Sequence, residues 1–296
     1  MERVRFEIRD CSAGEVERLT LELGVSGPLA QILVRRGLGV PERARAFLAA
    51  DEEHPPVAFV GIERAIEPIL RHARSGERIT IHGDYDVDGV CSTAVLVRSL
   101  RRIGANVDWY LPDRASDGYG LNSTTVRRLA ERGTRLLVTV DCAITAVEEV
   151  ALAKALGMEV VVTDHHAPRA DGVLPEAPIV HPAICEYPCP DLCATAVAHK
   201  LAQVLERAAV PQGSAHDGRA LEEDLDLVAL ATVADVVALV GENRTLVRRG
   251  LRALAGTAKP GLRALMSVAR VDPGKLDERS IAFALAPRLN AAGRLY

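Results

Sequence analysis

The feature that most constrains this 296-residue sequence is an alternation of short apolar runs with amphipathic segments, beginning near residue 78. The apolar runs RITIH, ANVDWYL, RLLVTVD, MEVVVTD and APIVH have the length of strands. The segments STAVLVRSLRRIG, NSTTVRRLAERG and TAVEEVALAKALG lie between them with the spacing of helices. Apolar strands that alternate with helices indicate a parallel sheet covered on both faces. The sequence therefore predicts an α/β fold with a parallel β-sheet flanked by helices.

Helical patterns flank this α/β region on both sides. Before it, PLAQILVRRG and PERARAFLA space their apolar residues along one helix face, and Pro41 suits the first turn of the second segment. After Pro190, the segments DLCATAVAHKLAQVLERA, EEDLDLVALATVADVV and ENRTLVRRGLRALAG predict further helices. We therefore expect a small helical N-terminal region over residues 1–75, an α/β domain over 76–240 and a helical C-terminal part over 241–296.

Composition and charge narrow the class of protein. The sequence has no uncharged apolar run of about 18 residues, and its charged N-terminus, MERVRFEIRDCSAGEVERL, lacks the apolar centre of a secretory signal. We therefore expect a cytoplasmic protein without a membrane segment. Because the net charge is −4 and aromatic residues make up 3%, a nucleic acid would have to be held by a local basic patch.

The six cysteines do not suggest a disulfide framework in a chain of this length. Three of them, Cys185, Cys189 and Cys193, have the spacing C-x₃-C-x₃-C, which could bind zinc or an iron–sulfur cluster. The segment lacks a C-x₂-C knuckle and a clear fourth ligand. Reduced cysteines around the start of a helix are therefore favoured over a metal cluster.

Acidic and histidine side chains follow four of the five predicted strands. They are Asp84, Asp86 and Asp88 after the first strand, Asp141 after LLVTV, Asp164, His165 and His166 after VVVT, and His181 after PIV. In a doubly wound sheet the carboxyl ends of the strands lie along one edge, where binding sites form. We therefore expect these side chains to converge, although Asp164 could instead cap a turn and His181 could be a hydrogen-bonded loop residue.

The stretch HGDYDVDG places three carboxylates at alternate positions directly after an apolar run. Carboxylates ~6.7 Å apart repel by roughly 2.5 kcal/mol at an effective dielectric of about 20, and a divalent cation would offset that cost. The stretch matches the start of an EF-hand, but Val95 occupies the position that needs a bidentate glutamate. Mixed carboxylate and imidazole ligands suit manganese, and magnesium less well. Two such ions ~3.5–4 Å apart form a clamp that hydrolyses phosphate esters.

A further acid, Asp235, lies within the apolar run ATVADVVAL. An unpaired carboxylate buried in such a helix would be costly. We therefore expect Asp235 to be paired or to bind metal, and we favour metal binding.

Six motifs together resemble one known family. HGDYDVDG, DCAIT, TDHH, HP, ATVADVVAL and APRLNAAGRL occur in the order found in the DHH phosphoesterases. The long forms of the first and last motifs are similar to those of the RecJ single-stranded-DNA exonucleases. The resemblance, which begins near residue 39, implies that residues 76–240 form a DHH catalytic domain. It implies stepwise 5′-to-3′ hydrolysis of single-stranded DNA to 5′ mononucleotides in DNA repair and recombination.

The resemblance also implies a cofactor, partners and residue roles. The cofactor would be two Mn²⁺ or Mg²⁺ ions acting in a two-metal mechanism, and partners would include helicases or single-strand-binding proteins. One ion would be held by His82 and Asp86, and the other by Asp88, His165 and Asp235, with Asp141 bridging them. Asp84 and His166 would complete the catalytic set with Asp141, His166 facing the scissile phosphate. Substrate contacts would come from Arg114, the GYGL segment, Arg288, Asn290 and Arg294.

The sequence departs from the family pattern at Ala143, Ala194 and Ala196, where glycine is usual. Because glycine often serves a positive φ or a close backbone approach, a Cβ at these positions could shift Asp141 or narrow the substrate path. No expected ligand is lost, so we expect metal binding to be retained. Family members continue past RLNAAGRL into a DHH-associated domain that is absent here, so we expect weak, poorly processive activity.

Three other functions remain as alternatives. A DHH phosphoesterase acting on short oligonucleotides, cyclic dinucleotides or pyrophosphate would use the same ligands, whereas a non-catalytic DNA-binding scaffold would be expected to lose them. An unrelated nucleotide-binding module would need a phosphate loop with open amides, and GDYDVDG is acidic. DNA would be held by local arginines, and the candidates are Arg98, Arg101, Arg102, Arg127, Arg128, Arg244, Arg248, Arg249 and Arg252.

Overall fold

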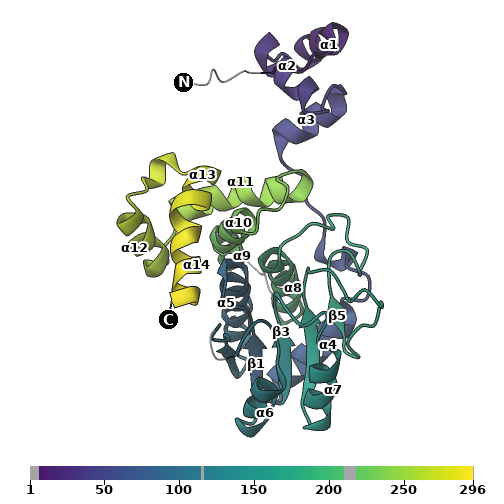
Figure 1. Ribbon diagram of the computed structural model, residues 1–296, viewed down its shortest axis with the longest axis vertical. Helices are drawn as coiled ribbons and strands as arrows, with labels where there is room; N and C mark the ends of the chain where they lie inside the picture. The colour runs from purple at the N-terminus through teal and green to yellow at the C-terminus, as the bar shows by residue number, and fades with distance from the viewer. Residues whose placement is uncertain (1–6, 115–116, 210–217, 296) are drawn as a thin grey trace.

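The computed structural model describes residues 7–114, 117–209 and 218–295, and a five-stranded parallel sheet lies at its centre (Figure 1). The strands have the order β2-β1-β3-β4-β5 across the sheet, with neighbours parallel throughout. Their bounds are β1 Ile79–His82, β2 Val107–Tyr110, β3 Leu136–Thr139, β4 Glu159–Thr163 and β5 Ile179–Val180. The predicted parallel α/β fold is confirmed.

Helices cover both faces of this sheet, which explains why its central strands are mostly apolar. On one face, Ile81 and Val138 join a core with helices α4 (Glu63–Arg74), α5 (Val87–Arg102) and α8 (Ala194–Ala209). On the other face, Leu137 and Val162 pack with α6 (Ser123–Glu131) and α7 (Val147–Ala155). Successive strand residues point to opposite faces, so a strand buried on both sides has apolar residues on both faces. The buried Thr80 of β1 is an exception, and its hydroxyl is hydrogen-bonded to Asp108 and Thr134.

Three N-terminal helices form a smaller core of their own. They are α1 (Ala13–Leu23), α2 (Gly27–Arg35) and α3 (Pro41–Ala49), followed by a 3₁₀ turn, η1 (Pro56–Ala58). Leu19, Ala30, Leu33 and Ala44 are buried among them. Pro41 is the first residue of α3, as predicted. Figure 1 shows these helices apart from the sheet, at the top of the view, next to α11.

The remaining helices cover one end of the α/β core. They are α9 (Arg219–Glu223), α10 (Leu225–Ala234), α11 (Gly241–Ala255), α12 (Pro260–Ala269), α13 (Glu278–Ser280) and α14 (Ala286–Leu295), with a 3₁₀ turn, η2 (Pro273–Lys275), and a π-helical turn, η3 (Ile281–Leu285). Among the residues that the structure describes, no helix is both long and apolar enough to span a bilayer.

Helices α10 and α11 approach each other closely at Gly250. A Cβ at this position would lie 2.2 Å from the carbonyl oxygen of Leu225 and 2.4 Å from Cβ of Ala229. The approach positions α10, which leads directly to Asp235.

We expect Gly250→Ala to destabilise the protein by roughly 1–3 kcal/mol. The helical propensity of alanine favours the change by about 1 kcal/mol, but overpacking against the backbone of α10 opposes it more strongly. Urea unfolding measures the difference. Gly261→Ala is the matched control, since a Cβ there would meet no atom within 4 Å. Equal stabilities for the two variants would contradict the close approach.

Candidate active site

Seven side chains from four parts of the chain gather at the carboxyl edge of the sheet. Three groups bring their ligand atoms within 4.8 Å of one another: Asp88, His165 and Asp235; Asp84, Asp86 and Asp141; and Asp141, His165 and His166. Asp84 and Asp86 follow β1, Asp141 follows β3 and the two histidines follow β4. Parallel strands end on the same edge, and residues distant in sequence therefore meet there.

His165 lies at the centre of this cluster. Its Nε2 atom is 3.3 Å from Oδ1 of Asp141, 3.7 Å from Oδ2 of Asp88 and 3.8 Å from Oδ2 of Asp235. These separations are too long for good hydrogen bonds, and Nε2 of His165 has no hydrogen-bond partner among the described residues. An ion between them would bring all four atoms into contact with one centre.

Buried polar atoms without partners provide a test of whether a metal fits. Among the described residues, three such atoms belong to the cluster, namely Oδ1 of Asp84, Oδ1 of Asp141 and Nε2 of His165. A fourth is Nε2 of His82, a predicted ligand that belongs to none of the three groups. An unpaired buried polar group is costly, and native proteins rarely leave several together. Oxygen and imidazole nitrogen are ligands of Mn²⁺, and of Mg²⁺ less ideally. The donor set therefore fits divalent metal.

The electrostatics of the cluster agree with an ion-binding site. Burial raises the pKa of Asp141 well above its usual range, and the neighbouring Asp88 and Asp86 raise it further. Burial also raises the pKa of Asp84 to about 6 and that of Asp235 to about 6. Burial lowers the pKa of His82 to about 4, so its imidazole is neutral at pH 7 and free to bind metal.

Asp235 lies at a helix end, not inside a helix as the sequence suggested. Helix α10 ends at Ala234, and Val236 has a φ of 60°, which turns the chain away. The side chain of Asp235 is 28% exposed, so this acid is only partly buried. Because Val236, and not a glycine or a proline, adopts this left-handed conformation, the end of α10 could not be recognised from the sequence.

Asp88 links the cluster to the first turn of α8. Its carboxylate accepts hydrogen bonds from the backbone nitrogens of Ala194 (2.7 Å) and Thr195 (2.8 Å) and from the Thr195 hydroxyl (2.6 Å). Unpaired amides at a helix N-terminus favour a carboxylate. Thr195 was not anticipated from the sequence, because its contact with Asp88 spans 107 residues.

The three alanines at usual glycine positions differ in their backbone. Ala194 and Ala196 lie in α8 without a positive φ, so their Cβ atoms meet no conformational obstacle there. Ala143 has a φ of 80° and Asp141 a φ of 61°, so the turn after β3 is left-handed at both. Only Ala143 thus occupies a conformation that favours glycine.

Asp164 organises the loop that carries the two histidines. Its Oδ1 accepts hydrogen bonds from Nδ1 of His166 (2.8 Å) and from the backbone nitrogen of His165 (2.8 Å), and its Oδ2 accepts one from the backbone nitrogen of Ile144 (2.9 Å). Burial alone would raise the pKa of Asp164, but these hydrogen bonds outweigh it and lower the pKa. The bond to Asp164 raises the pKa of His166. His181 donates from Nε2 to the carbonyl oxygen of His166 at 2.8 Å, so it supports the same loop.

We expect Asp164→Asn to destabilise the protein by about 1–3 kcal/mol, because the new amide NH₂ must face a buried donor. Urea unfolding measures the loss, and hydrogen exchange at Ile144 reports it locally. Asp171→Asn is the control: Asp171 pairs with Arg169 on the surface, where such a change costs about 0.5 kcal/mol or less. Equal losses in the two variants would show that Asp164 does not have this role.

The expected substrate-binding residues differ in their settings. The guanidinium of Arg114 lies 5.6 Å from the ring centre of Tyr85, beside the first motif. Asn290 accepts a hydrogen bond from the Val87 backbone at 3.0 Å, so α14 contacts the start of α5. Arg288 is exposed and donates to the carbonyl oxygen of Ala284. The side chain of Arg294 lies outside the described residues, although its backbone belongs to α14.

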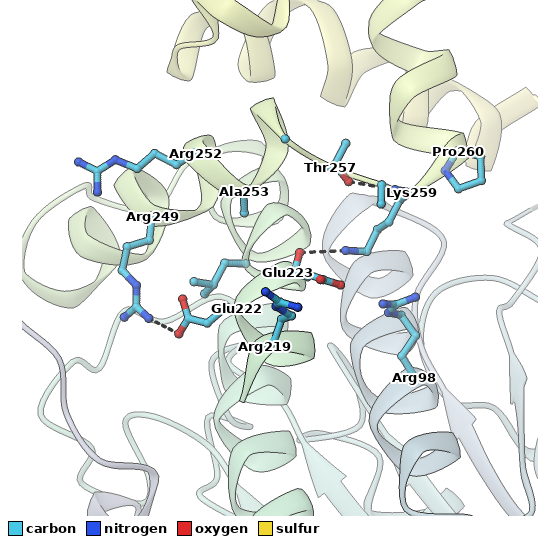
Figure 2. Close-up of a pocket in the computed structure, with 13 residues that line it drawn as sticks. Arg98, Arg219, Glu222, Glu223, Arg249, Arg252, Ala253, Thr257, Lys259 and Pro260 are labelled. Carbon is cyan, nitrogen blue, oxygen red and sulfur yellow. Dashed lines mark hydrogen bonds and ion pairs between the residues drawn. The ribbon is translucent and has the colours of Figure 1, made fainter. Parts of the chain in front are cut away.

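Several arginines considered for DNA binding are instead engaged in contacts away from the cluster. Arg98 and Arg102 pair with the buried Asp224, and Arg244 donates to the carbonyl oxygen of Phe47. Figure 2 shows a cavity lined by Arg98, near the C-terminal end of α5, and by Arg249, which pairs with Glu222. The volume of this cavity is about 750 Å³. Acidic partners thus neutralise the positive charges of Arg98, Arg102 and Arg249, which would be needed to bind a phosphate backbone.

The cysteines near α8 do not assemble into a metal site within the described residues. All six cysteines are free, and Cys185, Cys189 and Cys193 are buried. None of the three belongs to a group that could hold an ion. Cys193 directly precedes α8, which begins at Ala194.

Comparisons with known proteins identify the family. Residues 78–232 match the model of the DHH family, N-terminal domain. The single-stranded-DNA-specific exonuclease RecJ of Bacillus subtilis (strain 168) is 40% identical over 298 residues, covering 99% of this chain and 36% of the relative. RecJ of Escherichia coli (strain K12) is 43% identical over 243 residues, covering 79% of this chain and 42% of the relative.

A solved structure agrees with these matches. The crystal structure of RecJ in complex with Mn²⁺ from Thermus thermophilus aligns with a TM-score of 0.79 and 32% identity, covering 96% of this chain and 39% of the other. The chain thus spans well under half the length of these relatives. The family match covers more than half of the 296 residues and includes the sheet with most of the acid and histidine cluster. The chain therefore belongs to the DHH family.

Proposed function

We propose that this chain is the catalytic part of a metal-dependent 5′-to-3′ single-stranded-DNA exonuclease that releases 5′ mononucleotides during DNA repair and recombination. The observation that carries the proposal is the convergence of carboxylates and histidines whose buried ligand atoms lack partners among the described residues. The names of the relatives support the choice of single-stranded DNA as substrate.

The ligand roles follow the three groups in the cluster. Asp88, His165 and Asp235 would hold one ion, and Asp84 and Asp86 would surround the other, with Asp141 between them. His82 belongs to none of the three groups, and the family resemblance assigns it to the second ion. Bound ions would supply Lewis-acid activation of water and neutralise charge on the phosphate. Because Nδ1 of His166 is bonded to Asp164, its Nε2 is the ring nitrogen left to contact the scissile phosphate. Asp164 would hold the proton on Nδ1 and so keep this imidazole in one orientation.

DNA contacts are proposed for the residues that border the cluster. Arg114, Arg288, Asn290 and Arg294 would contact the strand or its phosphates. Arg114 is close enough to Asp84 for its charge to act on that carboxylate, so a phosphate held by Arg114 would lie near the ions. Such contacts would make DNA affinity fall with rising salt concentration.

The wider setting is proposed on the same basis. Residues 1–75 would form the helical N-terminal region, 76–240 the catalytic domain and 241–296 a helical connector. A role in DNA repair would place the protein in the cytoplasm, and its partners would be helicases or single-strand-binding proteins.

The test compares three substrates under single-turnover conditions in Mn²⁺. The chain is incubated with 5′-labelled single-stranded DNA, a cyclic dinucleotide and pyrophosphate, each beside an Asp141→Ala control. We expect the labelled DNA to yield mononucleotides and the control to be inactive. Turnover of only the cyclic dinucleotide and pyrophosphate would reject single-stranded DNA as the substrate. Absence of Mn²⁺-dependent turnover of all three substrates would reject the proposal that the chain is a metal-dependent enzyme.

A further inference from the structure

His82, a predicted metal ligand outside the three ligand groups, differs from His165 and His166 because its ring is completely enclosed. It is the last residue of β1 and is fully buried. Its Nε2 atom has no hydrogen-bond partner among the described residues. A neutral imidazole carries one proton on either nitrogen, and only the unprotonated nitrogen can bind a metal. What contacts Nδ1 therefore decides whether His82 can act as a ligand.

The atom next to Nδ1 is the thiol sulfur of Cys142. Sγ of Cys142 lies 3.6 Å from Nδ1 of His82 and 3.9 Å from the carbonyl oxygen of the same residue. One proton arrangement satisfies both contacts: Nδ1–H donates to sulfur, and S–H donates to the carbonyl oxygen. In that arrangement the lone pair is on Nε2, the atom that lacks a partner in the described part of the chain.

We propose that Cys142 is a positioning residue for the metal centre, because its thiol accepts a hydrogen bond from Nδ1 of His82 and thereby keeps Nε2 unprotonated and able to bind an ion. The inference rests on the proposed metal-dependent function. Metal-binding histidines commonly donate their second ring nitrogen to an acceptor, and loss of that acceptor weakens binding. Here the acceptor is a thiol from the residue directly after Asp141.

A thiol suits this position because it accepts a hydrogen bond without adding charge. The usual acceptor for such a histidine is a carboxylate or a carbonyl oxygen. A carboxylate would place a further negative charge beside Asp84 and Asp141, which already repel their neighbours. The Cys142 side chain is buried, where a neutral acceptor costs less than a charged one.

The plane of the His82 ring is fixed by a second contact. The ring stacks on Tyr110 with a centroid separation of 5.6 Å and an interplanar angle of 26°. The Tyr110 hydroxyl donates to Asp117 at 2.6 Å and accepts from Arg128 at 2.6 Å, so the tyrosine is itself held. Tyr110 thus limits the tilt of the ring, while Cys142 selects its tautomer.

The first measurement uses the metal-free protein. Nitrogen-15 NMR of labelled histidine distinguishes a protonated Nδ1 from a protonated Nε2. We expect His82 in the wild type to be protonated at Nδ1. In Cys142→Ala we expect its Nε2 form to appear, and in Cys142→Ser we expect the Nδ1 form to be restored, because a hydroxyl can accept the same bond. An unchanged tautomer in Cys142→Ala would overturn the proposal.

The second measurement is calorimetric titration with Mn²⁺. We expect Cys142→Ala to weaken binding by about 10–100-fold, with Cys142→Ser in between. Cys185→Ala is the matched control: this buried thiol bonds the carbonyl oxygen of Ile179 and touches no proposed ligand, so its affinity should equal that of the wild type. Equal affinity in Cys142→Ala and the wild type would reject the role of Cys142. Absence of Mn²⁺ binding to the wild type would instead reject the proposed function, while the NMR result would stand separately.

Discussion

Asp141→Asn is expected to lower nuclease activity by about 10³-fold or more and, in the metal-free protein, to raise the melting temperature. The loss of activity follows from the position of Asp141 in two of the three ligand groups. Removing several kcal/mol of transition-state stabilisation by metal corresponds to about three powers of ten in rate. The gain in stability follows from removing a buried charge that Asp88 and Asp86 repel.

The same variant should flatten the dependence of stability on pH. The pKa of Asp141 is higher in the folded protein than its ordinary value of 3.8, so protonation favours the folded state. That stabilisation is fully present below the unfolded pKa and is lost as pH rises toward the folded pKa. Asp84 and Asp235, each with a pKa of about 6, add the same trend between their ordinary value and pH 6. The metal-free wild type should therefore lose stability across this range, and Asp141→Asn should lose less.

Differential scanning calorimetry with and without Mn²⁺ measures both effects. Metal binding requires deprotonated ligands, so added Mn²⁺ should stabilise the wild type increasingly as pH rises. The variant should gain little from Mn²⁺ at any pH. A metal-free variant that melts below the wild type at neutral pH, or that gains as much from Mn²⁺, would show that Asp141 has a different role.

Lys200→Met is expected to destabilise the protein by about 3–5 kcal/mol. The side chain of Lys200 is 1% exposed and that of Glu242 is fully buried, with Nζ 2.5 Å from Oε1. The same carboxylate accepts hydrogen bonds from the His54 backbone (3.0 Å) and the Tyr187 hydroxyl (2.9 Å). Methionine fills the volume of the lysine but leaves Glu242 with an uncompensated charge in the core.

A double variant separates this explanation from a simple packing defect. Adding Glu242→Gln to Lys200→Met removes the orphaned charge and keeps an amide oxygen for the Tyr187 hydroxyl, so at least about 1 kcal/mol should be recovered. The single variant should melt roughly 6–20 °C below the wild type. A double variant no more stable than Lys200→Met would mean that burial of the charge is not the cause.

The sheet could be predicted from the sequence because each of its strands is a short apolar run between helices with clear ends. Asn122 caps α6, and Gly104, Gly133 and Gly157 adopt positive φ values two residues after the ends of α5, α6 and α7. The convergence of Asp141 with His165 was predictable for a related reason, since the carboxyl ends of parallel strands share one edge.

Contacts between distant helices could not be predicted in this way. The sequence made Arg98 a candidate for DNA binding. Only the folded chain brings it to the buried Asp224, which is 126 residues away in the sequence. Lys200 lies on a helix whose pattern gave no sign of the partner on α11. The contact between Asp88 and the start of α8 likewise depends on how two helices pack, which the spacing of apolar residues does not specify.

The bond between Asp88 and α8 has a kinetic consequence. The amides of Ala194 and Thr195 supply partial positive charge that holds this carboxylate before any ion arrives. Asp88, one of the proposed ligands, is therefore held in position before an ion binds, and its remaining lone pairs are available to the ion. Association should then be governed by how fast an ion sheds its water shell, so Mn²⁺ should load faster than Mg²⁺, which dehydrates reluctantly.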